Sequence, residues 1–394
     1  MDEFLSSARS GRRFAIVGPG GSNGFGSNSA IVVESGSRNS DGSGCAGGGS
    51  GGPVFFKEVS SRMANLSSAT TSGATSSSRS RSEAVEIIRR REKKWLDMLN
   101  NWAKVIAKDY QLVRERCRKG IPDSVRPKVW FHLCGAFYIN RDDPDLYRKC
   151  MTKVPNERTA DEIERDLERQ FPHHELFMQP DGHGQQALRR VLRAYAGAFP
   201  DVGYCQAMAP LAGALLLHMP ESDTFYTVYI LFDKYMRGYF RPGLDAVQVD
   251  GQILYGLLKR LNQPIYKHLV KYKVEPLHFM VDWFMCLYVR TLPWPTLLRV
   301  WMSTSARSFA SQSPWSPPCS APLLNAVACA HSKTPWTACA ACRPPPLRAA
   351  VLLPAALKLQ LSAADFEREH QKQFRLFNLR KLARQQQVQE QQEA

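Results

Sequence analysis

Apolar side chains recur at helical spacing over most of residues 84–301. A first helix is expected to begin after Ser82 as its N-cap and to end at Gly120 and Pro122, with Asp123 or Ser124 capping the next helix. The core-facing positions of the first helix are Ile88, Trp95, Leu99, Trp102 and Ile106.

The same pattern continues in shorter segments, several of them bounded by Pro or Gly. Further helices are expected at residues 143–152, 159–171, 185–198, 205–218, 222–237, 247–261, 264–272 and 276–290. The alternation of apolar and polar residues that is typical of strands is nearly absent. The pattern therefore predicts an all-α domain.

Residues 163–171, "IERDLERQF", form one of the most clearly amphipathic segments. Ile163, Leu167 and Phe171 share one helix face, and Asp166 and Arg169 are neighbours at spacing i, i+3. A carboxylate at this spacing can orient the guanidinium. Taken alone, an arginine here is most simply a solvated residue on a helix surface.

Residues 201–210, "DVGYCQAMAP", follow a helix whose core face is Leu188, Val191, Leu192 and Tyr195. Gln206 stands at the start of an otherwise apolar helix, which is expected to be buried. Its amide should therefore cap a backbone group or point into a cleft.

The first part of the chain and the part after Trp301 differ from the helical region in composition. Residues 1–81 are predicted to be a disordered tail, because 15 Gly and 20 Ser fill much of the first 80 positions. Residues 82–301 are expected to form the folded domain. Residues 302–361 are expected to be an irregular Pro- and Cys-rich segment, and residues 362–394 a helix with a Gln-rich tail that frays. Ser362 and Asp365 fit a capping box at the start of that helix.

The net charge of +16 favours anionic partners without choosing among acidic proteins, lipid headgroups and nucleic acid. The scattered cysteines favour reduced thiols, and the start of the chain lacks a signal-peptide pattern. The longest apolar run, residues 207–217, is shorter than the roughly 18 residues needed to span a bilayer. We therefore expect a soluble protein.

Three weaker motifs are best explained by ordinary sequence. The glycines of residues 12–26 lack the helix that a dinucleotide-binding loop opens. The basic runs at residues 78–83 and 89–94 lack an aromatic platform, so nucleic-acid binding is not expected. The spacings within a Cys- and His-containing group match no usual zinc pattern, so no metal site is expected; its members are Cys329, His331, Cys339 and Cys342.

Several motifs in order carry a resemblance: "RKGIP" with Arg126 and Trp130, "IERDLERQF", "GYCQAM" and "WFMCLYVRTLPWPTLLRVW". Together they resemble the TBC domain of Rab GTPase-activating proteins, over about residues 88–301. The signature I-x-x-D-x-x-R is matched by Ile163, Asp166 and Arg169, and Y-x-Q by Tyr204 and Gln206. "REKKWLDMLNNW", "FPHHELF" and "GHGQQ" resemble the EPI-sixty-four-like subgroup.

The resemblance implies an all-α TBC helical array that activates a Rab GTPase in trans, in vesicle trafficking, without substrate turnover of its own. Arg169 would supply the arginine finger and Gln206 the glutamine finger, with Asp166, Tyr204 and Ile163 in supporting or GTPase-binding roles. The domain would have no cofactor of its own and would act on Mg-GTP bound to the Rab. The resemblance also implies ezrin-type scaffold or cortical actin proteins as partners. It implies a cytoplasmic location, peripheral to the plasma membrane or endomembranes.

The sequence departs from the family after Trp301, where relatives continue with Asp and further helices of the domain. A frame error and an isoform that lacks these helices both remain open, and either would uncover apolar surface. Ala207 also replaces the glycine that is common after the glutamine. The alternative function is therefore a catalytically impaired GTPase- or scaffold-binding protein of membrane traffic and cortical actin.

Overall fold

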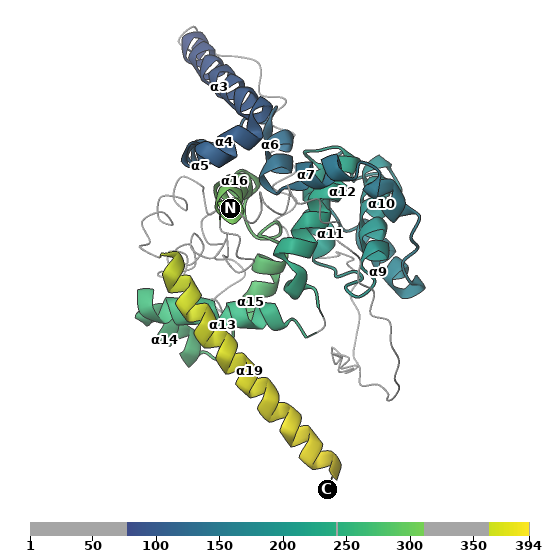
Figure 1. The fold of residues 1–394 in the computed structure, drawn as a ribbon, viewed down its shortest axis with the longest axis vertical. Helices are drawn as coiled ribbons and strands as arrows, with labels where there is room; N and C mark the ends of the chain where they lie inside the picture. Colours follow the sequence, from purple (N-terminus) through teal and green to yellow (C-terminus); the bar gives the residue numbers. More distant parts are fainter. Residues whose placement is uncertain (1–76, 242, 311–361, 394) are drawn as a thin grey trace, which may run out of the picture. The chain divides into compact units, whose positions relative to one another are not determined.

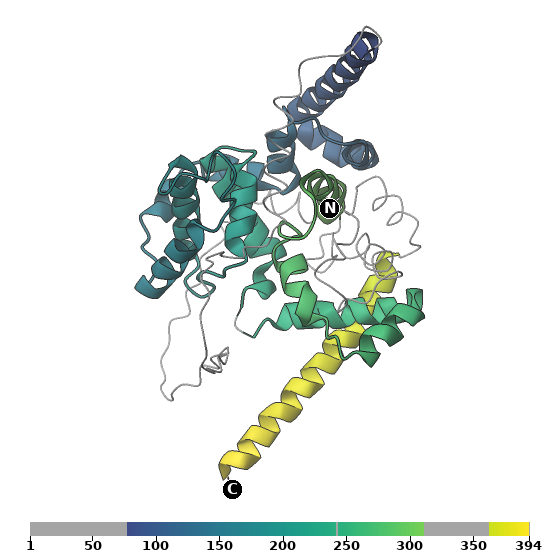
Figure 2. The ribbon, with the colours of Figure 1, turned by 180° about the vertical axis from the view of Figure 1, so that it is seen from behind.

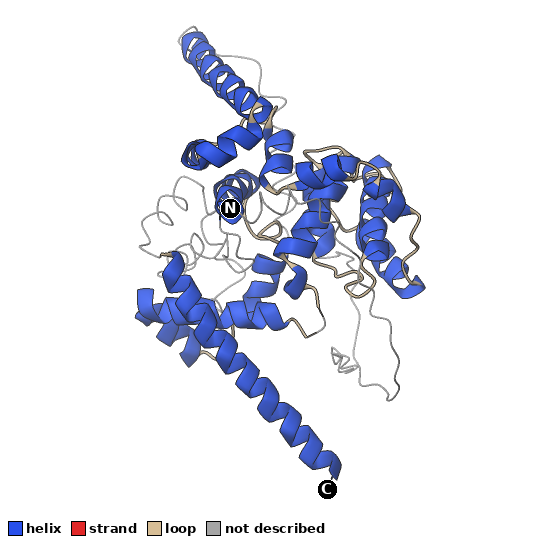
Figure 3. Ribbon diagram, viewed as in Figure 1, coloured by secondary structure: helices blue, strands red, loops and turns tan. Residues whose placement is uncertain are grey.

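The computed structural model describes residues 77–241, 243–310 and 362–393. Helices and the turns between them make up these residues, and no strand occurs among them (Figures 1 and 3). The expected all-α class is therefore confirmed. The expectations for residues 1–76, for the glycine-containing segment at residues 12–26 and for the Cys/His group fall outside the described residues, whereas residues 77–81, expected to belong to a disordered tail, are helical.

The first predicted helix is divided into three: α3 (Ser77–Asn100), α4 (Trp102–Lys108) and α5 (Tyr110–Lys119). The break before α5 has a local cause, because the Asp109 side chain accepts a hydrogen bond from the Leu112 backbone N–H at 3.2 Å. Gly120 ends α5 with φ of 103°, a conformation that favours glycine.

Two expectations for this region are wrong. Ser82 lies inside α3 and so is not an N-cap. Ile88 is exposed, whereas Trp95, Trp102 and Ile106 are buried as expected and Leu99 is half-buried against the core. The apolar face therefore joins the core only from Trp95 onward.

The next three helices are α6 (Arg126–Leu133), α7 (Ala136–Asp142) and α8 (Leu146–Met151). Neither expected cap begins α6, whose N-cap is Val125 without a side-chain hydrogen bond. Asp123 instead accepts a hydrogen bond from the Arg126 side chain, and the Ser124 hydroxyl donates to Glu92. Asp123 is thus used in a local ion pair and Ser124 in a tertiary contact with α3.

The central helices are α9 (Glu157–Leu167), α10 (His183–Ala198), α11 (Met208–Leu216) and α12 (Glu221–Ile230). α10 contacts α8, α9, α11 and α12. Its predicted core face is confirmed, since Leu188, Val191, Leu192 and Tyr195 are all buried. A π-helical turn, Leu231–Tyr235, continues α12, and a short 3-10 helix, Arg237–Tyr239, follows it.

The C-terminal half begins with α13 (Asp245–Leu261), α14 (Gln263–Lys271) and α15 (Leu277–Met280), which a π-helical turn at Val281–Met285 continues. α16 (Trp294–Ala310) then runs past Trp301, the position at which the composition changes. Met302 is buried, and its sulfur accepts a hydrogen bond from the Ile121 backbone N–H at 3.1 Å. The expectation of an irregular segment is therefore wrong for residues 302–310, which are helical, and Met302 packs as part of the fold.

The last helix, α19 (Ala363–Glu393), lies side by side with α13 (Figures 1 and 2). The capping box is confirmed: the Asp365 backbone N–H donates to the Ser362 hydroxyl at 3.2 Å, and the Ser362 backbone N–H donates to the Asp365 carboxylate at 2.9 Å. Helical backbone continues through the Gln-rich residues to Glu393, where fraying was expected. Among the helices of the described residues, none has the length and apolar character needed to cross a bilayer.

Candidate functional site

Arg169 lies in the turn that follows α9, because the helix ends at Leu167. The prediction that the helix extends to residue 171 is wrong, since Phe171 has a left-handed backbone with φ of 46°. The side-chain amide of the buried Gln170 donates to the Asp166 carbonyl at 2.8 Å and so satisfies a group that the helix end leaves open. The Arg169 side chain is 49% exposed.

Asp166 joins the two predicted site segments. Its side chain is only 8% exposed. One carboxylate oxygen accepts a hydrogen bond from the Arg169 guanidinium, and the other accepts one from the Tyr204 hydroxyl at 2.7 Å. The structure thus brings Asp166, Arg169 and Tyr204 together, although Tyr204 follows Asp166 by 38 positions.

Tyr204 is half-buried and acts as a hydrogen-bond donor. Burial raises the pKa of Tyr204 well above its usual range, and the hydrogen bond to Asp166 and the charge of that carboxylate raise it further. The hydroxyl therefore keeps its proton at neutral pH, and the donor that orients Asp166 is always present.

The loop at residues 201–207 presents Gln206. Its backbone bends at Gly203, with φ of 63°, where a Cβ atom would lie 3.6 Å from the Thr159 hydroxyl of α9. Gln206 is exposed and stands two residues before α11, whose residues are all buried. Since the start of α11 has no side-chain cap, the amide does not serve as the expected cap for that helix.

Ile163 is fully buried in the core, as is its neighbour on the same helix face, Leu167. Phe171 is half-buried and its ring lies 5.8 Å from that of Phe177 and 5.9 Å from that of Trp294, between ring centroids. The apolar stripe therefore anchors α9 from inside, and Ile163 is placed to support the site without reaching a partner's surface.

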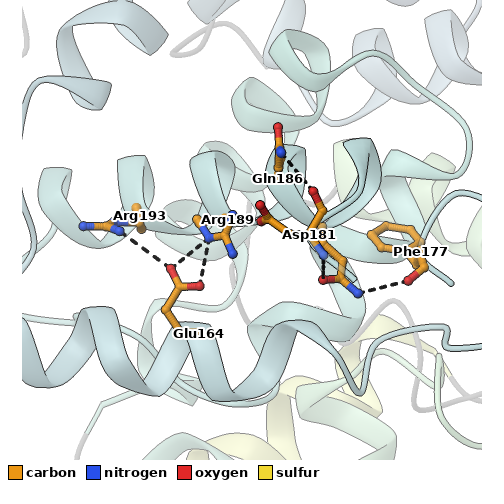
Figure 4. A network of polar contacts seen from close by, with 7 residues as sticks. Glu164, Phe177, Asp181, Gln186, Arg189 and Arg193 are labelled. Carbon is orange, nitrogen blue, oxygen red and sulfur yellow. Dashed lines mark hydrogen bonds and ion pairs between the residues drawn. The ribbon is translucent and has the colours of Figure 1, made fainter. Parts of the chain in front are cut away.

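A second polar network beside the site was missed from the sequence (Figure 4). Arg189 on α10 donates from Nε to both carboxylate oxygens of Glu164 on α9, at 2.9 and 2.8 Å, and from Nη1 to Asp181 at 2.6 Å. Arg193 Nη1 lies 3.6 Å from Glu164. The only signal in the sequence is the spacing of two arginines one helical turn apart, which does not identify their partners.

The site therefore offers an exposed guanidinium and an exposed amide, on two segments linked by a buried carboxylate. Such donors suit an anionic ligand that a partner molecule brings. No group of three or more His, Cys, Asp or Glu side chains suited to a metal ion occurs among residues 77–241, 243–310 and 362–393.

Residues 123–308 match the family model for the Rab-GTPase-TBC domain, RabGAP-TBC. TBC1 domain family member whacked of Drosophila melanogaster is 51% identical over 211 residues, which are 54% of this chain and 58% of that protein. TBC1 domain family member 10A of Mus musculus is 46% identical over 217 residues, 55% of this chain and 43% of that protein. The chain thus spans about half the length of these curated relatives.

Among solved structures, the Chlamydomonas flagellar RabGAP TBC domain aligns with a TM-score of 0.47 and 24% identity, over 61% of this chain and 81% of that one. The sequence relatives are TBC1 family members, and the matched residues include both signature segments. Over residues 123–308 the chain is therefore similar to the Rab-GTPase-TBC domain, and its sequence relatives belong to the TBC1 domain family.

Proposed function

We propose that the chain accelerates GTP hydrolysis by a Rab-family GTPase, to which it supplies Arg169 and Gln206 in trans. The match of residues 123–308 to the Rab-GTPase-TBC domain supports a Rab GTPase-activating role. The observation that carries the proposal is the pair of exposed polar side chains, Arg169 and Gln206, on segments that Asp166 holds together.

The chemistry requires neutralisation of charge on the transferring phosphoryl group. Arg169 pairs with Asp166 through Nη2, and a guanidinium has five N–H donors in all. The remaining donors can meet two phosphate oxygens of the bound GTP. Arginine suits this role because it stays protonated and its planar fork matches phosphate geometry.

Gln206 is proposed to hold the attacking water in line with the scissile bond. An amide can accept a hydrogen bond from the water and donate one to the GTPase or its nucleotide at the same time. Its exposed position, just before a rigid buried helix, keeps the amide accessible while the backbone beneath it is fixed.

Asp166 and Tyr204 are proposed to fix the two segments relative to each other. Asp166 accepts from Arg169 and Tyr204, so loss of its carboxylate would release both side chains. Tyr204 is also proposed to pack on the GTPase near the nucleotide. The Mg²⁺ ion and the GTP belong to the Rab, and this chain's residues act on them from outside.

A role in vesicle trafficking at the cytoplasmic side of the plasma membrane or endomembranes follows from the proposed Rab partner. Association with ezrin-type scaffold or cortical actin proteins rests on the resemblance to the EPI-sixty-four-like subgroup. The net charge of +16 is compatible with peripheral contact to anionic membranes.

The test is phosphate release from a panel of GTP-loaded Rabs. The wild-type chain should accelerate at least one, and Arg169→Ala and Gln206→Ala should each remove most of that acceleration; an arginine finger contributes about 10³–10⁵ in rate. Arg165→Ala, which removes another exposed arginine from α9, is the matched control and should leave the rate unchanged.

Circular dichroism should be the same for all variants. Full activity of Arg169→Ala contradicts the proposed mechanism. Binding to a GTP-loaded Rab without acceleration supports instead the alternative, a catalytically impaired GTPase- or scaffold-binding protein.

A further inference from the structure

Arg189 is the centre of an ion-pair network that ties α9 to α10 and to the loop between them (Figure 4). Its contacts reach Glu164, which stands in the last two turns of α9, and Asp181, which stands at the end of the loop. One side chain thus fixes both the helix before Arg169 and the segment after it.

The far end of the loop is held by further polar contacts. The Asp181 backbone N–H donates to the Gln185 side chain at 2.9 Å, and the Gln186 amide donates to the Asp181 carbonyl at 2.9 Å. Gln185, which is buried, also donates to the Phe177 carbonyl at 3.1 Å. These contacts maintain the left-handed backbone of Asp181, with φ of 52°.

The backbone of the loop packs closely against the start of α10. A Cβ atom on Gly184 would lie 2.2 Å from the Leu176 carbonyl oxygen, so the loop backbone rests directly on the start of α10. The loop therefore has little freedom to adjust if one of its attachments is lost.

Glu164 and Asp166 lie on the same helix but contact different parts of the chain. Asp166 faces the loop that carries Tyr204, whereas Glu164 faces Arg189 and Arg193 on α10. The contacts of these two acidic side chains and of the buried apolar stripe fix the orientation of α9 about its own axis. That orientation sets the direction in which the turn at Arg169 leaves the helix.

We propose that Arg189 is a positioning residue for Rab activation, which sets the orientation of the Arg169 turn by clamping Glu164 and Asp181. The inference rests on the proposed function, in which Arg189 acts through the Arg169 turn and not on GTP directly. The Arg189 contacts hold the pKa of Asp181 below its usual range, so the clamp stays charged at neutral pH.

Arg189→Met is the direct variant, and Arg190→Met is its matched control. Arg190 is the next residue on α10 and forms an equally good pair with Glu221, with two contacts of 2.7 Å, and this pair joins α10 to α12 rather than to α9. Single-turnover GTP hydrolysis by a responsive Rab gives a maximal rate constant and the protein concentration at half of that rate. For Arg189→Met the maximal rate should fall roughly tenfold, with the half-maximal concentration little changed, because misplaced catalytic groups lower the rate of the chemical step.

The loss should be absent when Arg169 has already been replaced. Arg189→Met should thus be no slower in the Arg169→Ala background, whereas a general loss of folding would lower activity in both. Arg189→Lys, which keeps the charge but not the fork, should recover part of the rate. Equal rate losses in Arg189→Met and Arg190→Met would overturn the proposal.

Hydrogen exchange provides a readout without a GTPase. Amides of residues 168–182 should exchange faster in Arg189→Met than in Arg190→Met or wild type. If the wild-type chain accelerates no Rab, the proposed function fails. The exchange data alone then test whether Arg189 holds residues 168–182 in place. Identical exchange in the two variants over residues 168–182 overturns the proposal.

Discussion

Asp166 in α9 is buried and Asp250 in α13 is half-buried, and a tyrosine hydroxyl donates to each carboxylate, but their surroundings differ. Tyr204 donates to Asp166, and Tyr239 donates to Asp250. Asp166 also pairs with Arg169, whereas no basic side chain of the described residues forms an ion pair with Asp250. Burial raises the pKa of Asp250 to about 6, which the hydrogen bond from Tyr239 only partly offsets.

The comparison distinguishes a carboxylate that links parts of the candidate site, Asp166, from a half-buried one that forms no ion pair within the described residues, Asp250. A buried acid with a cation and a phenol as partners links three parts of the chain, and its removal leaves those partners unsatisfied. A half-buried acid that has a phenol but no cation as partner among the described residues carries a desolvation cost that a neutral amide would lower. Substitutions at the two positions should therefore act in opposite directions.

Asp166→Ala should have the largest effect. It releases Arg169 and Tyr204 at once, so we expect a roughly 100-fold loss of Rab activation and a loss of about 2–3 kcal/mol in the free energy of unfolding. Phosphate release and urea unfolding measure the two effects. Asp250→Ala should leave Rab activation intact, and the comparison breaks down if it does not.

Asp250→Asn should stabilise the protein at neutral pH. The folded pKa of about 6 lies above the ordinary value, so the favourable contribution of Asp250 is complete below about pH 3.8 and is lost as the pH rises through about 6. The variant should therefore exceed wild type by about 1–2 kcal/mol at pH 7.5, with a smaller gain at pH 5. A gain that does not depend on pH would contradict this explanation.

The two tyrosines should give a smaller contrast. Tyr204→Phe and Tyr239→Phe each remove one hydrogen bond, at a cost of about 1 kcal/mol in the free energy of unfolding. Only Tyr204→Phe should also slow Rab activation, because only its partner holds Arg169. Equal kinetic effects in the two variants would remove the functional distinction.

The smallest effect is expected where α19 meets α13 through exposed ion pairs. Lys381 pairs with Asp245 at 2.7 Å, and both side chains are about half exposed. Lys381→Met should change the free energy of unfolding by less than about 0.5 kcal/mol, and salt should reduce that change further. A larger change at high salt would indicate that packing of the lysine stem matters.

Hydrophobic periodicity predicted the helical class and the buried face of α10, because long regular stripes leave little choice of structure. Hydrophobic periodicity did not predict the helix ends that are set by hydrogen bonds of polar side chains. The Asp109 side chain caps the start of α5. The Gln170 side-chain amide donates to the Asp166 carbonyl at the end of α9, before Phe171. Such choices depend on contacts that no spacing rule contains.

The candidate site, too, could be predicted only in part from the sequence. The signature residues could be named from the sequence, as could the contact between Asp166 and Arg169 at spacing i, i+3. The contact from Tyr204 to Asp166 and the Arg189 network join residues far apart in sequence, and charged residues on separate helices do not reveal their partners. Only the packing of α9 against α10 and against the loop at residues 201–207 brings them together.

The packing of α16 on the early helices has a consequence for synthesis on the ribosome. Arg299 donates to the Arg118 carbonyl at 2.6 Å, and Met302 covers Ile121, across 181 residues of sequence in each case. At roughly 5–20 residues per second, the early helices wait on the order of ten to forty seconds for this cover to emerge. During that interval their apolar surface is open to chaperones, and a stalled chain would be a substrate for quality control.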